Sequence, residues 1–279
     1  MISIEQLPNG FEYINIKNDF ASAKIALQGA QVYQYTRKDE DDILWVSDTS
    51  DFEYGKKIRG GVPVCWPWFG MQETNPEYPQ HGFARTALFE LLETKEIDTN
   101  ISQVTLKLNN SKDTLLMWPY YFELLVKITV GDKLIMELTT TNMDEVPFEI
   151  TQAFHTYFNI SNISNITIVG LNDKPYFDAL SDEQCKQNGD ITFNQEVDRV
   201  YQEVNNEIKL VDKQRTIKIK NDFSSSVIVW NPWIDKCKRL AGLRDDAYNN
   251  FVCIESANAM KDFIVLEPQD SHTLRATIF

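Results

Sequence analysis

Apolar and polar residues alternate one by one along much of the chain, most regularly in residues 121–130 and 134–141. Successive side chains of a β-strand point to opposite faces, so this period of two predicts strands with one buried face. Segments that alternate in this way, or that form short apolar runs of strand length, are residues 11–16, 21–27, 31–36, 43–46, 88–94, 102–108, 121–130, 134–141, 150–158, 166–169, 190–193, 207–211, 216–219, 226–230, 251–256, 263–266 and 272–278.

Helical periodicity is nearly absent from the same sequence. No segment keeps apolar residues at a spacing of 3.6, and only residues 113–118, closed by Pro119, suggest a short helical turn. We therefore predict an all-β protein: a large antiparallel β-sandwich of two stacked sheets, formed by residues 1–279 as a single domain. Two smaller β domains are the alternative.

Residues 47–86 interrupt the strand pattern. Residues 51–57 are polar, and residues 58–70 and 79–85 combine Gly, Pro and Trp in a way that suits neither strand nor helix. Irregular segments of this length in a compact protein usually serve a function. Gly60 and Gly61 would allow the backbone to come close to a ligand there.

The net charge of −14 at pH 7 restricts the partners of the protein. A negative field repels nucleic acids and anionic membrane surfaces, so we expect neither as a partner. An anionic small molecule would bind only where arginines reverse the local potential. No phosphate-binding glycine loop and no serine-hydrolase motif occurs in the sequence, which disfavours nucleotide-dependent and serine-hydrolase chemistry.

The four cysteines are far apart and form no CxxC pair, so their spacing predicts neither a zinc site nor a disulfide framework. The first residues lack the basic and apolar parts of a secretory signal, and no apolar run approaches the roughly 20 residues of a membrane span. These features favour a reducing cytoplasm.

His155 and Glu255 are the candidate acid and base. His155 lies among aromatic residues in segment 150–158, where it is either a hydrogen-bonded core residue or a catalytic group with a displaced pKa. Glu255 follows an apolar run, which would raise the carboxyl pKa towards neutrality; the alternative is an edge-strand glutamate facing water. The sequence does not show whether the two side chains meet.

Other polar and aromatic residues are candidates for substrate binding. Arg59 and Arg85 flank the irregular region and have the forked donors that suit phosphate or carboxylate, although surface salt bridges are an equal alternative. Asp198 could accept hydrogen bonds from sugar hydroxyls or be a solvated loop residue. His81 and Trp230 could contact or stack on a sugar ring, but a tryptophan is more often part of the core.

Six segments together resemble the aldose 1-epimerase (galactose mutarotase-like) superfamily, and within it the D-hexose-6-phosphate mutarotases, or glucose-6-phosphate 1-epimerases. Their order and spacing fit along nearly the whole chain. They are residues 59–70 (RGGVPVCWPWFG), 80–85 (QHGFAR), 153–158 (AFHTYF), 197–201 (VDRVY), 229–233 (VWNPW) and 252–255 (VCIE).

The resemblance implies a β-supersandwich enzyme that interconverts the anomers of a hexose 6-phosphate, without metal or cofactor. It implies that His155 and Glu255 are catalytic, that Arg59 and Arg85 bind phosphate, and that Asp198 binds the sugar. Substrate contacts are also expected from Gln80, His81 and Trp230. A monomer or weak homodimer is expected.

The chain departs from the family pattern after the glutamate, where Ser256, Ala257 and Asn258 follow. We expect this difference to affect the rim of the substrate site more than the catalytic pair. A mutarotase for free aldoses, a non-catalytic carbohydrate-binding protein and an interaction protein with a vestigial sugar site are the alternative functions.

Overall fold

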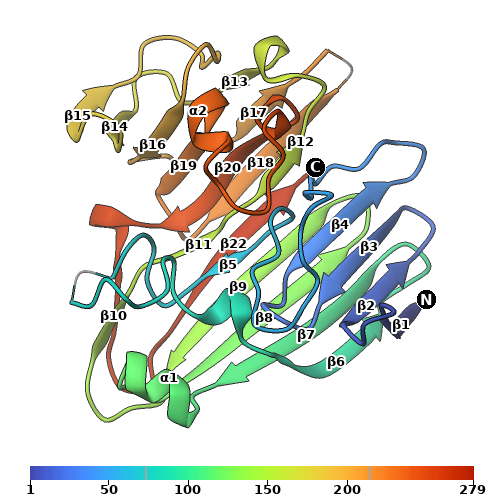
Figure 1. Cartoon of the computed structure of the whole chain (residues 1–279). Coiled ribbons are helices and arrows are strands. Elements are labelled where there is room, and N and C mark those ends of the chain that lie inside the picture. Colours follow the sequence, from blue (N-terminus) through green and yellow to red (C-terminus); the bar gives the residue numbers. More distant parts are fainter. Residues whose placement is uncertain (73, 214) are drawn as a thin grey trace.

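The computed structural model describes residues 1–72, 74–213 and 215–279, and it is built almost entirely from antiparallel β-sheets (Figure 1). Every pairing between its named strands is antiparallel, which confirms the predicted all-β class. The helices are short: α1 (Lys112–Met117), α2 (Trp233–Cys237) and the 3₁₀ turns η1 (Ala84–Thr86), η2 (Ile163–Asn165), η3 (Ala247–Asn249) and η4 (Met260–Asp262).

An eight-stranded sheet, which we call the back sheet, has the order β13-β17-β18-β22-β9-β8-β7-β6. Its long central strands alternate strictly between buried and half-buried residues, so one face packs in the core and the other meets solvent. Its strands are β6 (Glu90–Glu96), β7 (Ser102–Asn109), β8 (Phe122–Val130), β9 (Leu134–Asn142), β13 (Thr167–Val169), β17 (Ile208–Val211), β18 (Thr216–Asp222) and β22 (Ser271–Ile278).

The second eight-stranded sheet, the front sheet, has the order β15-β14-β16-β19-β20-β11-β5, and β12 also pairs with β20. Its central strands β19 and β20 are buried at every position. The strands are β5 (Val64–Cys65), β11 (Gln152–Phe154), β12 (Tyr157–Asn159), β14 (Pro175–Asp178), β15 (Glu183–Lys186), β16 (Val197–Tyr201), β19 (Ser226–Asn231) and β20 (Phe251–Asn258).

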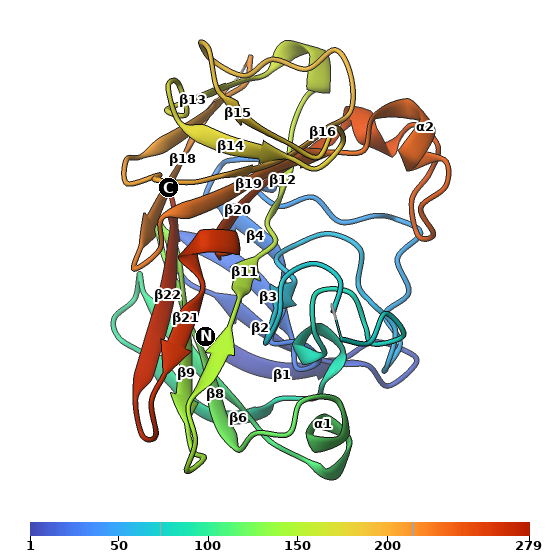
Figure 2. The ribbon, with the colours of Figure 1, turned by 90° about the vertical axis from the view of Figure 1, so that its left-hand side faces the viewer.

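A four-stranded sheet and a short two-stranded sheet complete the fold. In Figures 1 and 2 the four-stranded sheet lies at the same end of the molecule as β6 to β8, and β14 to β16 lie at the opposite end. The strands of the four-stranded sheet are β1 (Ile2–Gln6), β2 (Glu12–Lys17), β3 (Ala21–Ala26) and β4 (Val32–Arg37); those of the two-stranded sheet are β10 (Phe148–Ile150) and β21 (Ile264–Leu266).

The two faces of the front sheet belong to different apolar clusters. Val229 and Ile254 belong to the large core cluster, which also holds the inward residues of β8 and β9. Their neighbours Ile228 and Cys253 belong to a second, smaller cluster. Since side chains alternate along a strand, the odd-numbered residues of β20, including Glu255, point to this second face.

Several strand predictions were wrong in detail. The predicted strand 150–158 is divided into β10, β11 and β12, with His155 and Thr156 between the last two. Residues 43–46 and 190–193 form only isolated bridges. The pattern also missed β1, β14, β15 and β16, whereas the predicted turn at 113–118 corresponds to α1. None of the helices in the described residues is long and apolar enough to cross a membrane.

Candidate active site

A cavity of about 380 Å³ opens on the second face of the front sheet. Its wall is formed by front-sheet strands, by the irregular region 57–85, and by Lys236, Leu240 and Met260. It brings together all eight side chains that the sequence singled out: Arg59, Gln80, His81, Arg85, His155, Asp198, Trp230 and Glu255.

Glu255 lies in the middle of the front sheet. It sits on β20 opposite Ile228 of β19, and its side chain is only 1% exposed, so the alternative of an edge glutamate facing water is wrong. Burial, followed by the nearby Asp198 carboxylate, holds the pKa of Glu255 well above its usual value. Its Oε2 atom has no hydrogen-bond partner among the described residues.

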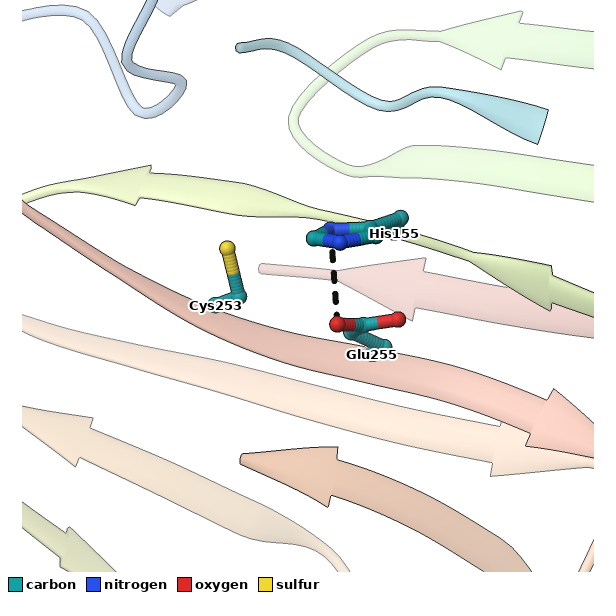
Figure 3. Close-up of side chains that lie close together, drawn as sticks. All are labelled: His155, Cys253 and Glu255. Atoms are coloured by element: carbon teal, nitrogen blue, oxygen red, sulfur yellow. Dashed lines mark ion pairs between the residues drawn. The ribbon is translucent and has the colours of Figure 1, made fainter. Parts of the chain in front are cut away.

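His155 lies at the interruption between β11 and β12. Both short strands pair with β20. Between them, the His155 backbone N–H donates a hydrogen bond to the Pro63 carbonyl at 3.0 Å. The ring stacks on Tyr157 at 4.9 Å between centroids, and its Nδ1 lies 3.3 Å from Glu255 Oε1 (Figure 3). The interruption of the strand thus places the imidazole beside the carboxyl group.

The surroundings of His155 and Glu255 disfavour a charge on either group. Burial first, then the neighbouring His81 ring and the positive charges of Arg85 and Arg59, hold the pKa of His155 well below its usual value. An empty cavity therefore favours a neutral imidazole and a protonated carboxyl group. The sequence predicted a raised pKa for Glu255 but could not show that burial acts on both groups at once, because that depends on how distant segments pack.

His81 has a defined tautomer. Its Nδ1 accepts a hydrogen bond from the Gly70 backbone N–H at 3.1 Å, so in the neutral ring the proton is on Nε2. Burial and the cations Arg85 and Lys57 lower the pKa of His81 to about 3, so the ring stays neutral at physiological pH. It can offer one N–H donor to a ligand without carrying charge.

Three cations line one part of the cavity, and none of them has a carboxylate partner among the described residues. Arg85 is buried, donates to the Gln80 carbonyl and has an unsatisfied Nε. Arg59 donates to the Ala241 carbonyl at 3.2 Å. Lys57, which the sequence did not predict as part of the site, lies exposed at the cavity rim, and partial loss of water and both arginines lower its pKa. The salt-bridge alternative for the two arginines therefore finds no support.

Gly60 and Gly61 have a structural role that differs from the expected one. Both have positive φ angles, 119° and 63°. A Cβ on Gly60 would come within 2.5 Å of the Val46 backbone, and one on Gly61 within 2.7 Å of the Tyr33 backbone. The glycines thus let neighbouring backbones pack closely and so hold Arg59 in place.

Asp198 belongs to strand β16 and not to a loop. Burial raises its pKa, while Lys236 of α2, 3.3 Å away, opposes this shift. Lys236 also pairs with Glu196 at 2.8 Å. The sequence predicted neither α2 nor Lys236, because a helix of five residues leaves no periodic signal.

Aromatic residues form the wall around His155. Trp230 is 8% exposed and packs edge-on to His155 at 5.9 Å. It borders the cavity together with Phe69. Tyr157 and Phe177 also border it, and the sequence did not point to these two as part of the site. Together with the neighbouring Cys253, the pair could hold a metal: His155, Cys253 and Glu255 have ligand atoms within 4.8 Å of one another.

Comparison with known proteins finds similarity along nearly the whole chain. The family model for aldose 1-epimerase matches residues 12–278. The chain belongs to the aldose 1-epimerase family. The match spans both large sheets and every residue of the cavity, as the resemblance of the six sequence segments implied.

Similar family members are known from bacteria and plants. A protein of Escherichia coli (strain K12) named "Putative glucose-6-phosphate 1-epimerase" is 33% identical over 265 residues, which cover 94% of this chain and 88% of the relative. A protein of the same name from Cenchrus ciliaris is 33% identical over 274 residues, covering 94% and 82%.

Solved structures show the same architecture. The crystal structure of a Salmonella typhimurium protein described as a "putative mutarotase" superposes with a TM-score of 0.92 at 31% identity, covering 99% of this chain and 92% of the other. A galactose mutarotase-like protein from Lactobacillus casei has a TM-score of 0.74 at 17% identity, covering 95% and 99%, and supports the fold alone. The predicted galactose mutarotase-like β-sandwich is confirmed.

Proposed function

We propose that this aldose 1-epimerase family member interconverts the α and β anomers of a hexose 6-phosphate, with glucose 6-phosphate as the first candidate. One observation supports this proposal most: an acid/base pair and three cations without a described carboxylate partner line the same cavity. The pair suits ring opening, and the cations suit a dianionic phosphate. The names of the relatives point to the same substrate.

Ring opening requires one base and one acid. Glu255, as carboxylate, removes the proton from the anomeric O1 hydroxyl, and His155, protonated, donates a proton to the ring oxygen O5. The C1–O5 bond breaks as the C1–O1 bond becomes a carbonyl. Rotation about C1–C2 then presents the other face of the aldehyde, and ring closure returns both protons.

The burial of the pair favours the product of this first step. Ring opening leaves Glu255 protonated and His155 neutral, which is the uncharged form that their surroundings stabilise. The ionic form has the same number of protons and arises by transfer across the 3.3 Å contact. Polar groups of the bound sugar replace the lost water around Glu255 and make this form accessible.

The phosphate would lie among Arg85, Arg59 and Lys57. A buried guanidinium without a counter-charge is costly, and a phosphate would supply that charge in forked hydrogen bonds. At the other side of the cavity Asp198, held by Lys236, would accept hydrogen bonds from sugar hydroxyls. His81 would donate its Nε2 proton to a substrate oxygen. The local cations also explain how a protein of net charge −14 could bind an anion.

Anomer exchange measured by NMR tests the proposal. Purified protein is mixed with glucose, galactose and mannose 6-phosphates and with the three free sugars. We expect exchange above the spontaneous rate, with a higher kcat/KM for a phosphorylated sugar, and loss of this excess in His155→Ala. Equal kcat/KM for free and phosphorylated sugars would favour a free-aldose mutarotase, and no catalysed exchange with any sugar would contradict an enzymatic function.

A further inference from the structure

We propose that His155, Cys253 and Glu255 form a binding site for a thiophilic divalent cation such as Zn²⁺, and that the bound cation inhibits the enzyme. One ligand atom from each side chain lies within 4.8 Å of the other two, and all three residues are buried. Imidazole, thiolate and carboxylate are the ligand types that zinc uses in proteins. Inhibition rests on the proposed function, whereas metal binding does not.

The strand register brings the three ligands together. Cys253 and Glu255 are two residues apart on β20, so both side chains point to the same face of the front sheet. Tyr157 pairs with Cys253 and Phe154 with Ser256, and this common register places His155 opposite Glu255. Figure 3 shows the three side chains on the same side of the β20 ribbon.

Two of the ligands have buried polar atoms that make no hydrogen bond to any described residue. Nδ1 of His155 and Oε2 of Glu255 make no hydrogen bond within the part of the chain that the structure describes. Polar atoms that are left in this state are costly, and a cation would satisfy them. This second observation distinguishes the cluster from a chance grouping of polar residues.

The geometry fits a site with three protein ligands and one open position. Zinc bond lengths of about 2.0–2.3 Å put tetrahedral ligand atoms roughly 3.3–3.8 Å apart, so rotations that move the side-chain ends by about 1 Å would complete the site. His155 and Glu255 border the cavity, and Cys253 lies behind them. A metal could therefore enter through the substrate cavity, with its open position facing that cavity.

Metal binding would stop anomer exchange because it uses both members of the acid/base pair. The thiol proton of Cys253 and the carboxyl proton of Glu255 are both released to the buffer, and the thiolate sulfur becomes the third ligand. The substrate and the metal cannot hold His155 and Glu255 at the same time. Inhibition is therefore competitive with the sugar and is reversed by a chelator.

Cys253→Ser, Cys253→Ala and Cys65→Ser provide the test, all made in a Cys185→Ser background that removes the half-buried thiol. Cys65 is the matched control, because it is as fully buried on the neighbouring part of the front sheet but does not belong to the cluster. Zn²⁺ binding is measured by calorimetry. Co²⁺ binding is measured by the charge-transfer absorption of a thiolate–cobalt bond.

We expect the background protein and Cys65→Ser to bind one equivalent of Zn²⁺ and to show the cobalt–thiolate band. Both Cys253 variants should keep anomer exchange, bind Zn²⁺ at least about tenfold more weakly and lack the band. Equal binding in all variants, or no cobalt–thiolate band in the background protein, would overturn the proposal. Because binding is read without substrate, this outcome is separate from a failure of the proposed mutarotase activity.

Discussion

The two large sheets differ in what covers their faces. Along β8 and β9 of the back sheet, buried residues alternate with half-buried ones, and the second face meets solvent. Along β19 and β20 of the front sheet every residue is buried. The second face of the front sheet is covered by loops and α2, and the cavity lies between them.

This difference explains where the chemistry is located. A carboxylate on the solvent face of the back sheet, such as Glu137, is hydrated and pairs with Lys127 at 2.8 Å. Glu255, on the covered face of the front sheet, has lost its water and has a raised pKa. A glutamate is therefore a hydrated, salt-bridged residue on the back sheet and a candidate base on the front sheet, because loops and α2 cover the second face of the front sheet.

The largest expected effect comes from Glu255→Gln. This change removes the proposed base while keeping the shape of the side chain, and we expect anomer exchange of glucose 6-phosphate to fall about 10²–10⁴-fold, as is typical for loss of a general base. Glu137→Gln on β9 is the matched control and should leave the rate unchanged. Similar rates for both variants, measured by exchange NMR, would remove the proposed distinction between the two sheets.

Arg85→Gln should have the next largest effect. Charge-assisted hydrogen bonds are worth about 1.5–3 kcal/mol, so we expect KM for glucose 6-phosphate to rise roughly 10–100-fold. KM for free glucose should change little. The control is Arg275→Gln, which alters a half-buried arginine on β22 of the back sheet. A parallel rise in KM for both sugars would argue against a phosphate site.

Lys57→Gln tests the cation that the sequence reading overlooked. Its side chain is exposed at the cavity rim, where solvent screens charge, so we expect only about a two- to fivefold rise in KM for glucose 6-phosphate. The rise should shrink further in high salt. Steady-state kinetics at two ionic strengths provide the measurement, and an effect that does not depend on salt would contradict an electrostatic role.

The smallest expected effect concerns stability. The folded chain keeps the Glu255 proton at pH values where the unfolded chain has released it, so this group's contribution to stability is largest below about pH 4.5 and declines as pH rises towards the raised folded pKa. The Glu255→Gln variant has no carboxyl proton at this position, so its stability should not show this decline with pH. The Tm of the variant minus that of the wild type should therefore be more positive at pH 8 than at pH 5, and an unchanged difference would argue against a buried, protonated Glu255.

The front sheet was the less predictable of the two, for physical reasons. Alternation identified β8 and β9 because their solvent face selects polar residues. In β16 the order is apolar, polar, polar, apolar, apolar, because Asp198 and Arg199 are polar residues on a largely covered sheet. β15 is an exposed edge strand without an apolar face, so it left no signal either.

The interruption at His155 could not be read from its segment. Residues 150–158 look like one continuous strand, yet the His155 and Tyr157 backbones bond Pro63 and Gly61, which come from the irregular loop. Pairing with a distant segment decided the local conformation there. Local pattern does not contain that information.

Residue types and their order along the chain were sufficient for the all-β class, for the family resemblance and for the eight candidate side chains. Tertiary structure alone decided that these side chains share one cavity, that Lys57 and Lys236 border it, and that His155 contacts Glu255 at 3.3 Å. The tertiary structure also decided the protonation states of His155 and Glu255. A pKa depends on the water and charges around a group, and segments far apart in the sequence supply both.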